Sequence, residues 1–203
     1  MRYPRGIFVN SCIVDVAYDT EQLAALLAHY RKLGQEVRSE YNRLGHTSSD
    51  KRERWHKARL KVLGPDYCSL GNQVERAAGL YCVGLYLRFQ ALLTAFRSLR
   101  GVTTLADLVK RYPALKKASS YKKVHELGLV YRASVDGRDS PAAKQLKSLR
   151  PDYFKCESIE VQGRKFPMDP VFGNLGVAEK DFLRYASALK DFARVIQRQL
   201  PIP

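Results

Sequence analysis

The chain has 203 residues, of which 45% are hydrophobic and 27% are charged. This length and composition are ordinary for a folded globular protein with a sizeable core, which excludes a low-hydrophobicity disordered chain. The 35 Lys and Arg residues outnumber the 20 Asp and Glu residues, and the formal net charge is +15. Such a positive field favours a polyanionic partner, and nucleic acid is the first choice.

The N-terminal half is predicted to begin with a strand. Residues 7 to 18, IFVNSCIVDVAY, are rich in β-branched residues, and alternate positions from Cys12 to Tyr18 are apolar. Asp19 or Thr20 is then expected to cap a long helix that Gly45 stops, because apolar residues follow at steps of three and four. Further helices are predicted over about 50–63 and 72–99.

The apolar stretch from 77 to 96 approaches the composition of a membrane span. Arg88 and Gln90 lie inside it, and a charge at that depth in lipid is costly. We therefore expect a buried core helix and no membrane partner. Four well-separated cysteines and an N-terminus without a signal-peptide pattern predict a reducing, cytoplasmic location.

In the second half of the chain, capping, proline and glycine residues separate several short predicted helices and strands. Thr104 to Asp107 matches a capping box and predicts a short helix that ends before Pro113. A second short helix, about 114–126, is expected to stop at Gly128. Residues 129–135 predict a strand followed by a hairpin turn at Asp136-Gly137. Beyond it we predict a helix over 141–149, a strand over 158–166, and an amphipathic helix over about 178–200.

The predicted fold class is mainly α, a helical bundle with a small β element. That element comprises the N-terminal strand and the strands near 129–135 and 158–166. The expected domain organisation is a β segment over 1–18, a basic helical nucleic-acid-binding domain over 19–150, and a C-terminal part over 151–203 that packs back on the bundle.

The predicted helix at 50–63, DKRERWHKARLKVL, is the main candidate for phosphate contacts. Arg54, Lys57 and Lys61 share one face, and Trp55 anchors another. A solvated face that only keeps the protein soluble is the alternative. The complete predicted nucleic-acid-binding set is Arg52, Arg54, Trp55, Lys57, Arg59, Lys61, Lys122, Lys123, Arg132 and Arg138.

Catalytic and metal-binding patterns are weak. The carboxylates are scattered, no glycine-rich phosphate loop is present, and Cys68 with Cys82 supplies only two zinc ligands. We expect no catalytic site, no metal and no cofactor in this chain. A small RNase that uses His56 or His125 is a remaining alternative.

Two other functions stay open. The segment 104–138 resembles a winged helix-turn-helix, in which Lys122 and Lys123 would enter the major groove of DNA. A helical scaffold whose cations contact an acidic protein partner is the third possibility.

Residues 60–82, LKVLGPDYCSLGNQVERAAGLYC, resemble a stretch in the recognition lobe of miniature type V CRISPR nucleases. The order of a β segment followed by helices is similar to the N-terminal wedge and recognition-lobe region of that family. The resemblance implies binding of a guide RNA and its target through backbone charge. It implies a cytoplasmic ribonucleoprotein that binds RNA or an RNA–DNA hybrid more readily than duplex DNA, with a homodimer or larger complex left open. The nuclease domain of the family has no counterpart here.

Overall fold

The computed structural model describes residues 5–45, 77–95, 101–137, 139–154, 158–161, 164–167 and 175–199. The helices are α1 (Arg5–Gly45), an unlabelled segment Ala77–Ala95, α3 (Leu105–Arg111), α4 (Tyr121–Asp136), α5 (Pro141–Leu149) and α6 (Glu179–Gln199). Two 3-10 turns, η2 (Pro113–Lys117) and η3 (Pro151–Phe154), connect them. Strands β1 (Ser158–Val161) and β2 (Arg164–Pro167) form an antiparallel hairpin.

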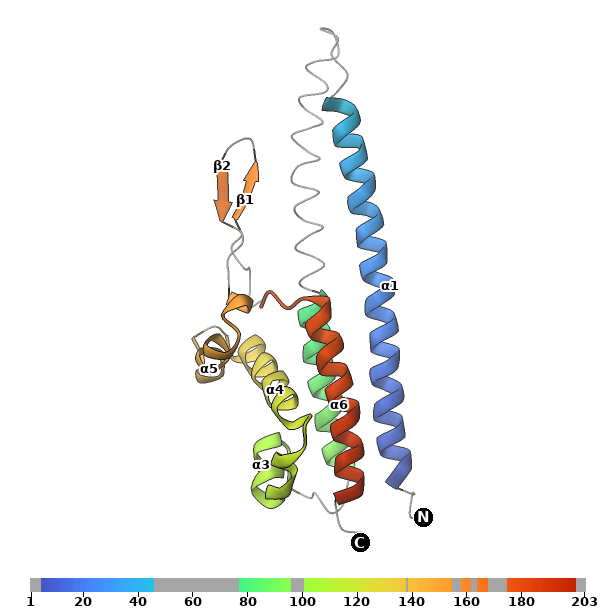
Figure 1. Ribbon diagram of the computed structural model, residues 1–203, viewed down its shortest axis with the longest axis vertical. Coiled ribbons are helices and arrows are strands. Elements are labelled where there is room, and N and C mark those ends of the chain that lie inside the picture. Colours follow the sequence, from blue (N-terminus) through green and yellow to red (C-terminus); the bar gives the residue numbers. More distant parts are fainter. Residues whose placement is uncertain are drawn as a thin grey trace.

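Three long helices form the spine of the molecule. Helices α1 and α6 and the segment Ala77–Ala95 lie side by side, and α3, α4 and α5 lie on the side of α6 away from α1 (Figure 1). One cluster of buried side chains runs through all of these helices. Its aromatic contacts include Phe89 against Phe192, with ring centroids 6.1 Å apart, and Tyr81 edge-on to Phe182.

The segment Ala77–Ala95 is long and apolar enough to cross a membrane, and it is the only such helix among the described residues. Its core face is buried between α1, α4 and α6, as the contacts of Phe89 and Tyr86 with Phe192 and Tyr131 show. Arg88 leaves this face and pairs with Asp19 of α1. The segment therefore packs as a bundle helix within the described structure.

The predicted N-terminal strand is wrong, because residues 7–18 belong to α1. Val9, Cys12 and Val16 recur at helical spacing and are buried against the bundle. The expected cap at Thr20 is also wrong: its hydroxyl donates to the carbonyl of Val16 at 2.7 Å, as a threonine inside a helix does. The expected domain boundary at residue 18 consequently falls inside a continuous helix.

The predicted strand at 129–135 is wrong as well, since α4 continues to Asp136. Gly128 does not stop the helix. A Cβ atom there would lie 3.0 Å from the Tyr86 ring, so glycine permits close helix packing. Gly137, with φ at 89°, caps the end of α4 instead of making a hairpin turn. No wing follows in this part of the described chain, which contradicts the winged-helix alternative.

The expected fold class is therefore corrected. The described body of the protein is helical, and neither the N-terminal strand nor the 129–135 strand exists to form a β element within it. The β1–β2 hairpin joins no larger sheet. The predicted capping box of α3 is present, with Thr104 as the N-cap.

Two glycine substitutions test the close packing at Gly128. We expect Gly84→Ala to stabilise the protein by about 0.5–1 kcal/mol, because alanine favours the helix and nothing lies within 4 Å of the new methyl group. Gly128→Ala gains the same helix propensity but pushes against Tyr86, whose ring is stacked on Tyr131. Overpacking costs about 1–3 kcal/mol, so the net change is a loss of about 1 kcal/mol. Urea unfolding measures both; equal stabilisation by the two variants would contradict the packing role of Gly128.

Candidate functional site

The structure places only part of the predicted nucleic-acid-binding set. Arg52, Arg54, Trp55, Lys57, Arg59, Lys61 and Arg138 lie outside the described residues. Lys122, Lys123 and Arg132 all lie on α4 and are exposed. Arg132 follows Lys123 by nine residues, which puts it about 13 Å further along the axis and on the opposite side of the helix. Arg132 is therefore not part of the same surface as Lys123.

Five exposed lysines lie on α3, on η2 and in the first turn of α4, which follow one another along the chain. We define the basic turn as the exposed side chains of Lys110, Lys116, Lys117, Lys122 and Lys123. The sequence contains no Asp or Glu between Asp107 and Glu126. Within the described part of the chain, none of the five ammonium groups has a carboxylate partner within ion-pair distance. The basic turn is thus an uncompensated positive surface.

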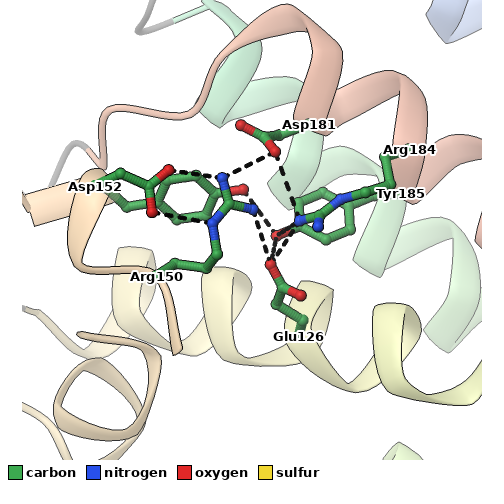
Figure 2. Close-up of polar contacts among 7 residues, drawn as sticks. Glu126, Arg150, Asp152, Asp181, Arg184 and Tyr185 are labelled. Atoms are coloured by element: carbon green, nitrogen blue, oxygen red, sulfur yellow. Dashed lines mark hydrogen bonds and ion pairs between the residues drawn. The ribbon is translucent and has the colours of Figure 1, made fainter. Parts of the chain in front are cut away.

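The carboxylates that border the basic turn are already occupied. Asp107 accepts hydrogen bonds from the Thr104 hydroxyl at 2.7 Å and from the Thr104 backbone N–H at 3.2 Å. These bonds, the hydroxyl bond first, lower the pKa of Asp107. Glu126, three and four residues after Lys123 and Lys122 on α4, has its carboxylate in a polar cluster between α4, η3 and α6 (Figure 2). Neither carboxylate forms an ion pair with a described lysine of the basic turn, although Asp107 keeps its negative charge three residues before Lys110.

Arg150, at the end of α5, is the centre of that cluster. Its guanidinium contacts both oxygens of Asp152, at 3.0 and 2.7 Å, and reaches Asp181 at 2.9 Å and Glu126 at 3.0 Å (Figure 2). It also covers the ring of Tyr153, 3.9 Å from the centroid. Burial lowers the pKa of Arg150, but the carboxylates outweigh this effect and the pKa is raised overall.

Glu126 receives three donors on one oxygen. Its Oε1 accepts from Arg150 at 3.0 Å, from Arg184 at 2.6 Å and from the Tyr185 hydroxyl at 2.5 Å. The Tyr185 hydroxyl donates its hydrogen to Glu126. The Tyr153 hydroxyl is therefore the donor in the 2.9 Å contact between the two tyrosines. Burial is the main cause that raises the pKa of both Tyr153 and Tyr185, so both stay protonated in neutral solution.

The polar cluster links three parts of the bundle. It joins α4, the α5–η3 junction and α6 through charge-assisted bonds that occupy each carboxylate. Among the described side chains, only the Ser120 hydroxyl and Nε of Arg184 are buried without a hydrogen-bond partner. Sequence reasoning missed the cluster; the one local signal is the spacing of Asp181 and Arg184, three residues apart on α6.

His125, the described candidate of the RNase alternative, is half-buried on α4 beside Tyr121. Burial lowers its pKa, and the charge of Arg132 lowers it further. The imidazole is therefore neutral at pH 7. A neutral ring of this kind is poorly suited to act as a general acid. His56 lies outside the described residues.

The described cysteines are buried thiols. Burial raises the pKa of Cys12 to about 11, and burial also raises the pKa of Cys82. Both remain protonated at neutral pH, whereas zinc binds the thiolate. No group of three or more His, Cys, Asp or Glu side chains is gathered for a metal ion among the residues described, and Cys68 lies outside them.

The basic turn and the polar cluster thus have different chemistry. The first is an open surface of like charge, and the second is a closed set of paired charges. Only the first is free to meet a partner. No protein-family model, no curated protein and no solved structure matches the chain.

Proposed function

We propose that this protein binds nucleic acid through phosphate contacts and performs no chemistry of its own. The observation that carries the proposal is the basic turn, whose five exposed lysines border carboxylates that already have internal partners. Lysines carried by the consecutive elements α3, η2 and α4, none of them in a described ion pair, suit a phosphate backbone. The net charge of +15 adds long-range attraction.

RNA or an RNA–DNA hybrid is the proposed partner ahead of duplex DNA. Lysine ammonium groups act as point charges and carry no code for base edges, so the basic turn suits a partner whose sequence is read elsewhere. In a ribonucleoprotein, base pairing with a guide supplies that specificity. This setting is the one that the resemblance of residues 60–82 to type V CRISPR nucleases implies, and we propose a cytoplasmic location together with it.

The test is fluorescence anisotropy with labelled single-stranded RNA, RNA–DNA hybrid and duplex DNA. The variant carries Lys116→Gln, Lys117→Gln, Lys122→Gln and Lys123→Gln. If each lysine neutralises one phosphate, the slope of log affinity against log salt falls by about 3, and affinity at physiological salt falls about a hundredfold. All four side chains are exposed, so the fold is expected to persist.

A matched control removes the same charge elsewhere. Lys32→Gln and Arg38→Gln on α1, with Lys180→Gln and Arg198→Gln on α6, also neutralise four exposed cations. This control should weaken RNA binding far less and change the salt slope by less than 1. Equal losses in both variants would show that net charge, not the basic turn, drives binding. Absence of RNA binding at low salt, with tight binding to polyglutamate, would favour the acidic-partner alternative.

A further inference from the structure

In addition to the buried line of Val9, Cys12 and Val16, α1 carries a line of exposed side chains on the face opposite the core. We define the outer stripe as the residues that follow one another at alternating steps of four and three: Ile7, Ser11, Val14, Tyr18, Glu21, Ala25 and Ala28. All seven are exposed. The three large members, Ile7, Val14 and Tyr18, have 49%, 64% and 58% of their surface exposed. Three large apolar side chains on four successive turns, with only Ser11 between them and all away from the core, indicate an interaction surface.

The spacing of the outer stripe is that of a coiled-coil seam. Alternating steps of four and three keep one line of side chains against a second helix. We propose that the outer stripe is a self-association surface, on which α1 of a second copy of this chain packs in antiparallel orientation. The pairing is two-fold symmetric, so each contact occurs twice.

The side chains of the outer stripe complement one another in this orientation. With the two-fold axis at the level of Val16, Val14 of one copy faces Tyr18 of the other. Ser11 faces Glu21, so a hydroxyl meets a carboxylate and can donate to it. Ile7 faces Ala25, which pairs a large side chain with a small one. A parallel pairing would instead place Glu21 against Glu21 and repel.

Charged side chains on the flank of the outer stripe come close to the same axis. Asp15 lies beside the stripe and pairs with Arg88 at 3.7 Å, and both side chains keep 43% of their surface exposed. With the axis at Val16, the Asp15 side chains of the two copies lie next to each other. Each lies beside its own Arg88, which also pairs with Asp19, so these cations offset part of the repulsion between the two acids.

Self-association through the outer stripe leaves the basic turn free. The α3–η2–α4 unit lies on the side of α6 away from α1 (Figure 1). The self-association proposal therefore does not depend on nucleic-acid binding.

The first test is sedimentation equilibrium of the full chain, purified with nuclease treatment so that nucleic acid cannot bridge copies. We expect a reversible monomer–dimer equilibrium. Val14→Glu with Tyr18→Glu should weaken the dimer at least about a hundredfold, because both buried contacts at the axis acquire charges. The matched control is Val135→Glu with Leu149→Glu, which changes two side chains of similar exposure outside α1 and should leave the dimer intact.

A second variant tests the orientation without removing any apolar contact. Ser11→Lys places an ammonium group opposite Glu21 twice per antiparallel dimer, and should tighten it about fivefold. In a parallel dimer the two new lysines would face each other and weaken association. A chain that stays monomeric up to about 100 µM, a dimer that neither variant changes, or a dimer that Ser11→Lys weakens would overturn the proposal.

Discussion

Replacement of Arg150 by methionine is expected to destabilise the protein by about 3–5 kcal/mol, the usual cost of breaking a buried charge cluster. Arg150 contacts Asp152, Asp181 and Glu126, and only 16% of its side chain is exposed. Methionine fills similar space but leaves the carboxylates of Asp181 and Glu126 buried with fewer partners. Urea unfolding followed by circular dichroism gives the free energy of unfolding.

The matched control for Arg150→Met is Arg194→Met. Arg194 pairs with Asp191 at 3.1 Å on the same helix, but the two side chains are 49% and 58% exposed. Solvent screens such a pair, so its loss should cost less than about 0.5 kcal/mol. Adding Asp181→Asn to Arg150→Met should recover part of the stability, because it removes the surplus acid while Arg184 still pairs with Glu126. Equal losses for the Arg150 and Arg194 variants would contradict the structural role of the polar cluster.

The difference between these two arginines illustrates which parts of the structure the sequence can predict. Arg194 and Asp191 are close because they are three residues apart on one helix, and that is visible in the sequence. Arg150 meets Glu126 and Asp181 only after α4, α5 and α6 have packed together. No spacing along the chain encodes that meeting, which is why the polar cluster was missed.

Helix-start residues and the spacing of apolar residues predicted several elements well. The helix predicted at 141–149 is observed as Pro141–Leu149, and the helix predicted at about 178–200 is observed as Glu179–Gln199. Of the side chains that the helical period of 178–200 places inward, Phe182 and Phe192 are buried, whereas Leu183 keeps 44% of its surface exposed. A proline in the first turn is a strong signal for the start of a helix, and apolar residues repeated at helical spacing over several turns are a strong signal for its extent. Both depend only on residues that are close in the sequence.

The prediction of an N-terminal strand failed because the apolar residues of this short segment fit both the two-residue period of a strand and the 3.6-residue period of a helix. Cys12, Val14, Val16 and Tyr18 alternate as a strand would, yet Val14 and Tyr18 are exposed while Cys12 and Val16 are buried. Apolar residues on two faces of α1 create the false alternation. If the outer stripe binds a second copy, the same residues that misled the prediction serve association. Gly128 misled it in another way, since its role is contact with Tyr86 on a different helix.

Replacement of Phe89 by alanine is the second large expected effect, a loss of about 3–5 kcal/mol. Phe89 is fully buried on the segment Ala77–Ala95, where its ring lies 5.8 Å from Tyr86 and 6.1 Å from Phe192 of α6. Truncation leaves a cavity where the segment meets α6, and the rings around it are too constrained by their own contacts to fill it. Urea unfolding in detergent-free buffer measures the loss.

Leu87→Ala is the control within the same segment. Leu87 lies two positions before Phe89 and has 48% of its surface exposed, so its truncation should change stability by less than about 0.5 kcal/mol. If this apolar segment is a bundle helix with one solvent-exposed face, Phe89→Ala should lower the free energy of unfolding much more than Leu87→Ala. Comparable losses would contradict this arrangement, because they would show that the Leu87 side chain is as closely packed within the bundle as Phe89.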